Sequence, residues 1–276
     1  MAFNIRETAN EHILIMAHRG VSGGNIPCNT LASYEIALKQ GADIIETDLE
    51  MTADGKLVIF HPGKEVTHLG YHGAISALSW SEAKQLRYLN CDGTSTQFGI
   101  ETFDDLLEQF KGRCYINVDK FWGHPEEIYR AIKRHNMQEQ ILAKSAPSRA
   151  IFDMLEELAP DLPYMTILRA PLCEEIEHRN INYIGAEVVF GAEDHPLASQ
   201  AYIDEMHKKG KLVLANAIIY DYLDQIAAGH SDDTALTSGM DEGWGWLADR
   251  GFDIIQTDWT GMLFDYLKSS HKYYKS

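Results

Sequence analysis

Short apolar runs rich in β-branched residues recur along the chain and alternate with segments of helical periodicity. Most runs are apolar on both faces, which is the pattern of parallel strands covered by helices on both sides. We therefore predict strands at residues 13–17, 43–49, 57–60, 114–119, 141–144, 164–169, 184–190, 211–217 and 253–258.

The intervening segments carry helix-start signals, either a capping residue or a first-turn proline. These signals stand at Asn29, Ser79, Thr102 and Pro125. We expect the helix capped by Asn29 to stop at Gly41, and the Ser79/Glu82 pair has capping-box spacing ahead of apolar positions that reach Leu89. Three further segments have helical periodicity: 147–159, 197–209 and 241–250.

Alternating strands and helices without a Gly/Pro-rich linker predict a single α/β domain over residues 1–276. Eight strand–helix units in a chain of this length make a TIM (β/α)8 barrel. Nine runs are one too many, and periodicity does not identify the surplus one. Only the turn at residues 53–55 separates the second run from the third, and residues 62–100 form an insertion after the third.

Composition narrows the possible partners. Acidic residues outnumber basic ones by 41 to 24, and the formal net charge of −17 argues against nucleic acid or an anionic membrane as a partner. No apolar stretch approaches a membrane span, so we expect no stable membrane insertion. Four widely spaced cysteines without a CxxC pair favour a reducing, cytoplasmic location: Cys28, Cys91, Cys114 and Cys173.

Carboxylates follow two of the predicted strands at the ends where barrel enzymes carry their functional residues. Glu46 and Asp48 are two positions apart, so on an extended strand they project to the same side, and Asp119 ends the fourth run. Three unpaired carboxylates would repel one another, and a bound cation removes that cost. Ligands that are all oxygen suit Mg²⁺ or Ca²⁺ better than zinc.

Histidines and cations follow the same strands. His18 and His61 would supply a proton donor and a proton acceptor near pH 7, while Arg19 and Lys120 supply fixed positive charge for an anion. Metal, two histidines, arginine and lysine together describe a phosphoester site. A local concentration of positive charge of this kind lets an acidic protein bind an anionic substrate.

These residues lie in a longer pattern that resembles the glycerophosphodiester phosphodiesterase family, whose fold is the phosphatidylinositol-phospholipase-C-like TIM barrel. Residues 17–61 carry, in order, His-Arg-Gly, an Asn-Thr helix start, Gly-Ala-Asp, Glu-x-Asp, Thr-x-Asp-Gly and His. Residues 97–107 are similar to the family's Pro-Thr-Leu segment and 115–120 to its Asn-Ile-Glu-x-Lys strand. Residues 251–263 are similar to its Gly-x-Asp-x-Ile-x-Thr-Asp motif.

The resemblance implies roles for the residues that match. One divalent cation, Mg²⁺ or Ca²⁺, would be held by Glu46, Asp48 and Asp119. The general acid/base pair would be His18 and His61, and Arg19 would bind the phosphate. The family reaction cleaves a phosphodiester into a phosphomonoester and an alcohol.

The chain also departs from the family pattern. Cys28 and Pro62 replace acidic residues, and the penultimate strand keeps Asn216 of the Trp-Thr-x-Asn motif without its tryptophan. We expect Trp259 to replace that apolar wall. Phosphate or substrate contacts are thus predicted at Arg19, Lys120, Asn216 and Trp259.

We therefore predict metal-dependent hydrolysis of small glycerophosphodiesters to glycerol phosphate and an alcohol, with either histidine in either role. One alternative is a phosphodiesterase for another head group, such as a lysophospholipid or a glycosylated glycerophosphate. The other is a metal- or phosphoester-binding barrel without turnover, which the changes at Cys28 and Pro62 keep open.

Overall fold

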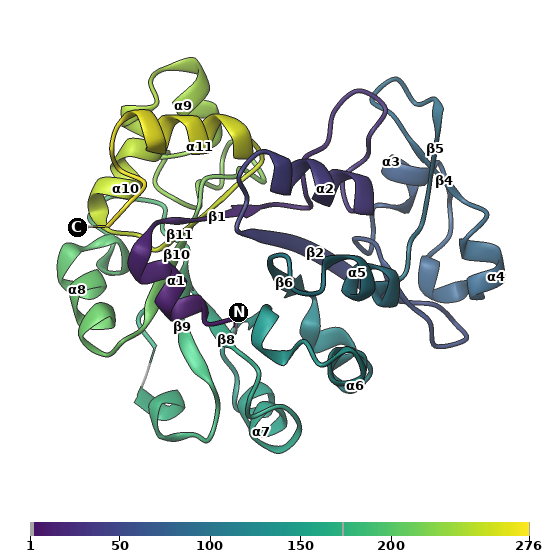
Figure 1. The fold of residues 1–276 in the computed structure, drawn as a ribbon, viewed down its shortest axis with the longest axis horizontal. Helices are drawn as coiled ribbons and strands as arrows, with labels where there is room; N and C mark the ends of the chain where they lie inside the picture. The colour runs from purple at the N-terminus through teal and green to yellow at the C-terminus, as the bar shows by residue number, and fades with distance from the viewer. Residues whose placement is uncertain (1–2, 173, 276) are drawn as a thin grey trace.

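Parallel strands close into a barrel in this computed structural model, which describes residues 3–172 and 174–275 (Figure 1). Each strand pairs with the next, and β1 pairs with both β11 and β2, which closes the ring. The barrel strands are β1 (Leu14–Ala17), β2 (Ile44–Met51), β6 (Tyr115–Asp119), β7 (Ile141–Ser145), β8 (Tyr164–Leu168), β9 (Tyr183–Val188), β10 (Leu212–Asn216) and β11 (Ile254–Thr257). The predicted TIM barrel is confirmed. Cys173, counted among the cysteines above, lies outside the described residues.

The surplus strand is the third predicted run. It forms β3 (Leu57–Ile59), which pairs antiparallel with β2 outside the barrel, with Met51 opposite Leu57. The turn between β2 and β3 is too short for the crossover that a parallel pairing needs, so only a hairpin can form there.

Residues 62–100 fold beside the barrel, on the right in Figure 1. This segment contains α3 (Glu65–Leu69), a 3₁₀ turn (Ile75–Ala77), α4 (Trp80–Ala83) and the hairpin of β4 (Arg87–Leu89) with β5 (Ser95–Gly99). Its apolar residues Leu69, Ile75 and Tyr88 form a separate cluster with Phe60, which follows β3. The capping box at Ser79 and Glu82 is present, but the expected helix ends at Ala83 because the following residues pair as β4.

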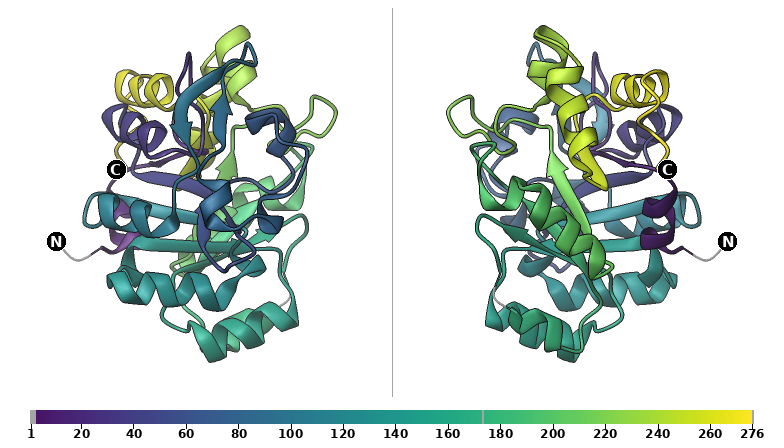
Figure 2. Two further views of the ribbon diagram at one scale, coloured as in Figure 1. Left: turned by 90° about the vertical axis from the view of Figure 1, so that its right-hand side faces the viewer. Right: turned by 90° about the vertical axis from the view of Figure 1, so that its left-hand side faces the viewer.

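Helices surround the strands, as Figure 2 shows from two sides. They are α2 (Leu31–Lys39), α5 (Phe103–Phe110), α6 (Pro125–His135), α7 (Arg149–Leu158), α8 (Gln200–Lys208), α9 (Asp232–Thr237), α10 (Trp246–Arg250) and α11 (Thr260–Ser269). Short 3₁₀ or π turns lie at Phe121–Gly123, Gln138–Gln140, Glu174–His178, Pro196–Ala198 and Asp241–Gly245. No helix in residues 3–172 or 174–275 has the length and apolar content that a membrane crossing requires.

The first helix, α1 (Ile5–Glu11), closes the barrel at the amino ends of the strands. Its buried residues Ile5 and Ala9 join an apolar cluster with inward-facing residues of the barrel strands, among them Leu14, Ile44 and Leu212. Apolar packing therefore fills the barrel interior at this end.

The predicted cap of α2 is wrong by one residue. Thr30 is the N-cap, because its Oγ1 accepts from the backbone N–H of Ser33. Asn29 has a positive φ of 54° and its side chain is buried, turned toward β2. Asn29 therefore contacts Asp48 in the candidate site and does not cap α2.

Gly185 in β9 provides a test of the barrel packing. A Cβ at this position would lie 2.0 Å from the carbonyl oxygen of Leu212 in β10, so the strands would have to separate. We predict that Gly185→Ala lowers the free energy of unfolding by about 3 kcal/mol in urea denaturation. Gly23→Ala is the control, because a Cβ there has no atom within 4 Å. Equal unfolding midpoints for the two variants would contradict the close approach of β9 and β10.

Candidate active site

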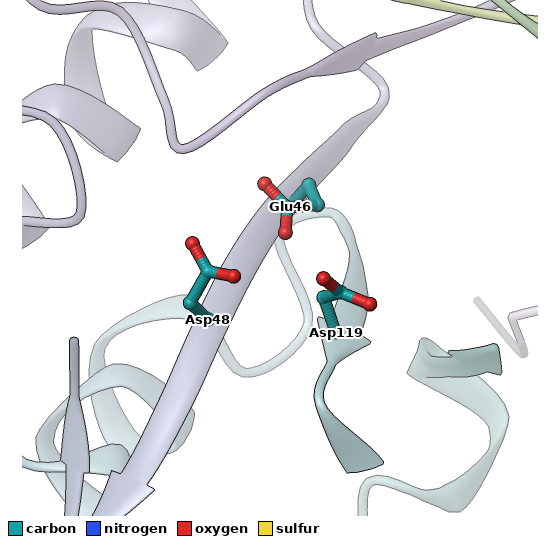
Figure 3. A group of neighbouring side chains, drawn as sticks. All are labelled: Glu46, Asp48 and Asp119. Atoms are coloured by element: carbon teal, nitrogen blue, oxygen red, sulfur yellow. The ribbon is translucent and has the colours of Figure 1, made fainter. Parts of the chain in front are cut away.

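Three carboxylates converge at the carboxyl ends of β2 and β6 (Figure 3). Glu46 and Asp48 alternate along β2, and the parallel register places Asp48 opposite Asp119 of β6. One oxygen from each of the three lies within 4.8 Å of the others. The predicted convergence is therefore present in the fold.

Asp48 lies deepest in this group, with no exposed surface. Its Oδ2 accepts a 2.9 Å hydrogen bond from Asn29 Nδ2 and lies 2.9 Å from Arg19 Nε. Its Oδ1 is buried and has no hydrogen-bond donor, although His61 Nε2 and Lys120 Nζ each lie 3.9 Å away. A buried carboxylate oxygen without a partner is costly, and a cation bound between the three carboxylates would supply one.

The charges in this group act on one another. Burial, then Asp48 and Asp119, raise the pKa of Glu46 to about 7. Burial also opposes ionisation of Asp119, but Lys120 and Lys144 outweigh it and lower the pKa of that carboxyl. The cluster is thus short of positive charge at Glu46. An all-oxygen donor set of this kind fits a hard divalent cation.

The two histidines line the same pocket as Glu46 and Asp119 and have different partners. His18 Nδ1 donates to Asp258 Oδ1 at 2.8 Å. Burial lowers the pKa of His18, but the hydrogen bond to Asp258 and the charge of Glu46 outweigh this, so the pKa is raised. His61 Nδ1 donates to the carbonyl of Pro62 at 2.8 Å, which leaves Nε2 of a neutral His61 free to accept a proton.

Arg19 and Lys120 both have left-handed backbones, with φ of 55° and 61°. Non-glycine residues in this region are uncommon and concentrate at functional sites. The turn at Arg19 lets its backbone N–H donate to Glu46 Oε2 at 2.8 Å. The turn at Lys120 places Nζ 2.6 Å from Asp119 Oδ2 and 5.4 Å from the centre of the Trp122 ring.

A pocket of about 280 Å³ brings the predicted residues together. The predicted residues that line it are His18, Arg19, Glu46, His61, Asp119, Lys120 and Asn216. Trp259 lies instead in a neighbouring groove of about 890 Å³, which shares His18 and Arg19 with the pocket. The Trp259 side chain is 48% exposed.

Sequence reasoning missed a buried ion pair in the same pocket. Lys144 Nζ lies 2.6 Å from Glu187 Oε2, and Asn216 Nδ2 donates to Glu187 Oε1 at 2.7 Å. The signal for this pair in the sequence was a lysine and a glutamate within otherwise apolar predicted strands, 141–144 and 184–190. Asn29 was also missed, because its position before a helix indicated a cap. Its Oδ1 accepts from Tyr34 Oη at 2.9 Å, which fixes the amide that holds Asp48.

Comparison with known proteins agrees with this geometry. The model of the glycerophosphoryl diester phosphodiesterase family matches residues 18–260. The chain belongs to this family. Phosphoric diester hydrolysis is therefore its class of activity, and the acidic group is a potential site for the divalent metal on which the family generally depends.

Individual relatives are distant in sequence. A glycerophosphodiester phosphodiesterase of Bacillus subtilis is 26% identical over 223 residues, which cover 74% of this chain and 75% of the relative. A probable glycerophosphodiester phosphodiesterase 1 of Mycobacterium tuberculosis is 40% identical over 125 residues, 43% of this chain and 42% of the relative.

Solved structures share the fold. A glycerophosphoryl diester phosphodiesterase from Parabacteroides distasonis aligns with a TM-score of 0.80 and 19% identity, over 98% of this chain and 93% of that one. A phosphodiesterase from Oleispira antarctica, solved with the product sn-glycerol-3-phosphate, aligns with a TM-score of 0.66 and 22% identity. That alignment covers 92% of this chain and 96% of the other.

The unpartnered oxygen of Asp48 leads to a prediction about cation binding. We expect MgCl₂ or CaCl₂ to raise the melting temperature of the protein, because a cation that binds only the folded state adds about 2.7 kcal/mol at a hundred times its Kd. Asp48→Asn should abolish this rise in differential scanning fluorimetry. Asp204→Asn, at an exposed carboxylate of α8, should leave it unchanged. An equal rise in all three proteins would place the cation elsewhere.

Proposed function

We propose that this protein hydrolyses small glycerophosphodiesters to glycerol phosphate and an alcohol, with one divalent cation, Mg²⁺ or Ca²⁺. A single observation carries the proposal: two histidines with different partners and two cations line one pocket together with Glu46 and Asp119, and the buried Asp48 completes the carboxylate cluster. Membership of the phosphodiesterase family supports the same reaction.

Glu46, Asp48 and Asp119 would hold the cation, and Asp48 would contribute the oxygen that lacks a hydrogen bond. When bound, the cation would supply positive charge to a phosphoryl oxygen and so favour attack at phosphorus. Arg19 and Lys120 are each paired with a carboxylate of the cluster, so a cation there would free part of their charge for the other phosphate oxygens.

The two histidines would divide the proton transfers. His61 Nε2 would accept the proton of the attacking hydroxyl as the new P–O bond forms. If that hydroxyl is water, glycerol phosphate forms directly; if it is the neighbouring glycerol hydroxyl, a cyclic phosphate forms first, and water must then open it to give glycerol phosphate. His18, held by Asp258, would donate its Nε2 proton to the leaving alkoxide as the old P–O bond breaks. The hydrogen-bond partners of the two histidines support these roles. The carboxylate of Asp258 favours the charged, proton-donating form of His18, whereas the carbonyl of Pro62 only fixes the tautomer of His61.

A lysophospholipid is the second candidate substrate. The groove beside His18 and Arg19 is lined by Trp259 and Met262, which are 48% and 40% exposed. Apolar surface continuous with the catalytic pocket would suit an acyl chain next to the scissile phosphate. Deacylated and acylated diesters therefore belong in the same assay.

Phosphorus NMR of glycerophosphocholine, glycerophosphoethanolamine and lysophosphatidylcholine, each with Mg²⁺, Ca²⁺ or chelator, tests the proposed function. We expect metal-dependent conversion of at least one diester, reduced by about 10²-fold or more in His18→Ala and in His61→Ala. His72→Ala is the control, since His72 is exposed in the 62–100 segment. Cation binding without cleavage of any diester would contradict hydrolysis and favour a barrel that only binds.

The pairing of His18 with Asp258 predicts a change in pH dependence. Asp258 raises the pKa of His18, so Asp258→Asn should lower it. If His18 donates the proton, the alkaline limb of the kcat–pH profile will move to lower pH, because the acid form is lost earlier. Asp204→Asn, at an exposed carboxylate of α8, should leave the profile in place. Movement of the acidic limb instead would make His18 the base.

A further inference from the structure

A second pocket, of about 600 Å³, lies at the opposite end of the barrel, beside the amino ends of β1, β10 and β11. Four segments enclose it: α1 with the start of β1, the turn from α8 into β10, the turn from α10 into β11, and the chain after α11. The first and last of these are joined by hydrogen bonds from Ile13 N to Tyr273 O and from Lys275 N to Glu11 O. Figure 2 shows both chain ends on this side of the molecule.

Basic side chains line this pocket, in contrast to the composition of the chain. Acidic residues are the more numerous type overall, 41 to 24, yet among the described residues that line the pocket Asp253 is the one carboxylate. The basic residues that line it are Arg6, His207, Lys211, Lys272 and Lys275. The excess of basic over acidic side chains is therefore local to this pocket.

Asp253 is already fully engaged. Its Oδ1 pairs with Lys275, and its Oδ2 accepts from the backbone N–H of Val213 at 2.7 Å and lies 3.0 Å from His207 Nε2. Both oxygens of this carboxylate therefore already have partners, and neither Arg6 nor Lys211 is among them.

Arg6 and Lys211 both donate hydrogen bonds to one neutral acceptor. Arg6 Nη2 donates to the carbonyl oxygen of Tyr183 at 3.0 Å, and Lys211 Nζ donates to the same oxygen. Arg6 Nε is buried and has no partner, whereas Lys211 Nζ also forms an ion pair with Glu177 Oε2 at 3.5 Å. Burial lowers the pKa of both groups; at Lys211 the charge of Glu177 opposes this effect and that of Arg6 adds to it. Among the described residues the two cations therefore share one carbonyl and one carboxylate, so one positive charge lacks a compensating negative charge.

We propose that this pocket is a second binding site for a phosphate-type oxyanion, with Arg6 and Lys211 as its principal ligands. A guanidinium beside an ammonium is the usual protein partner of a phosphate group. The volume exceeds that of inorganic phosphate, so a phosphomonoester with a small organic part also fits. The pocket and the catalytic pocket have no lining residue in common, so the two sites can be tested separately.

Isothermal titration with inorganic phosphate and with glycerol 3-phosphate tests this site. The titrations use chelator and an Asp48→Asn background, so that the catalytic pocket contributes no metal-assisted binding. We expect saturable binding of at least one of the two, weakened tenfold or more by Lys211→Met and by Arg6→Gln. Lys209→Met is the matched control, because Lys209 is two residues away and outside the pocket.

Circular dichroism and urea midpoints will show whether the two variants fold as the parent does. Phosphorus line broadening of the added anion gives a second readout that does not depend on heat. Unchanged affinity in either folded pocket variant would overturn the proposal. So would binding of both anions no tighter than that of chloride at equal ionic strength.

Discussion

The mutual repulsion of three carboxylates at the ends of β2 and β6 is the constraint on which the active end of this barrel depends. Glu46 and Asp48 are buried, and the strand register brings Asp119 to them. Ionised carboxylates this close are stable only with compensating charge. Arg19 and Lys120 provide part of it from left-handed turns, and the remaining unpartnered oxygen of Asp48 is where the cation is needed.

The two ends of the barrel are specialised in opposite ways. Near the amino ends, apolar side chains from the strands pack under α1 and form a conventional core. Near the carboxyl ends, β7, β9 and β10 contribute Lys144, Glu187 and Asn216 to a hydrogen-bonded group beside the carboxylates. A buried ion pair of this kind adds little net stability, since desolvation offsets most of its attraction. Its position in the pocket wall indicates a role in holding the site.

Most of this fold can be predicted from the sequence, because the periodicity that marks a strand is a local property. Every predicted strand is present, and the residues at the strand ends meet as a parallel barrel requires. Periodicity does not encode strand direction, so the hairpin pairing of β3 needed the structure. The helix expected from Ser79 to Leu89 was cut short because cross-strand pairing with β5 overrides the local pattern.

The missed site residues share a physical reason. Asn29 has the chemistry of a helix cap, and only the positive φ at this residue and the neighbouring Tyr34 show that it serves Asp48. Lys144 and Glu187 are 43 residues apart, and their pairing depends on the barrel between them. Contacts of this range are not visible in the spacing of residues along the chain.

Anomalous diffraction from crystals soaked in Mn²⁺ tests the central claim most directly, because manganese accepts the oxygen ligands that suit Mg²⁺ and is located by its own signal. The account predicts one strong peak bonded to an oxygen of each of Glu46, Asp48 and Asp119, with Asp48 contributing Oδ1. An absent peak at this position, with Arg19 and Lys120 as the only positive charges beside the three carboxylates, would contradict it.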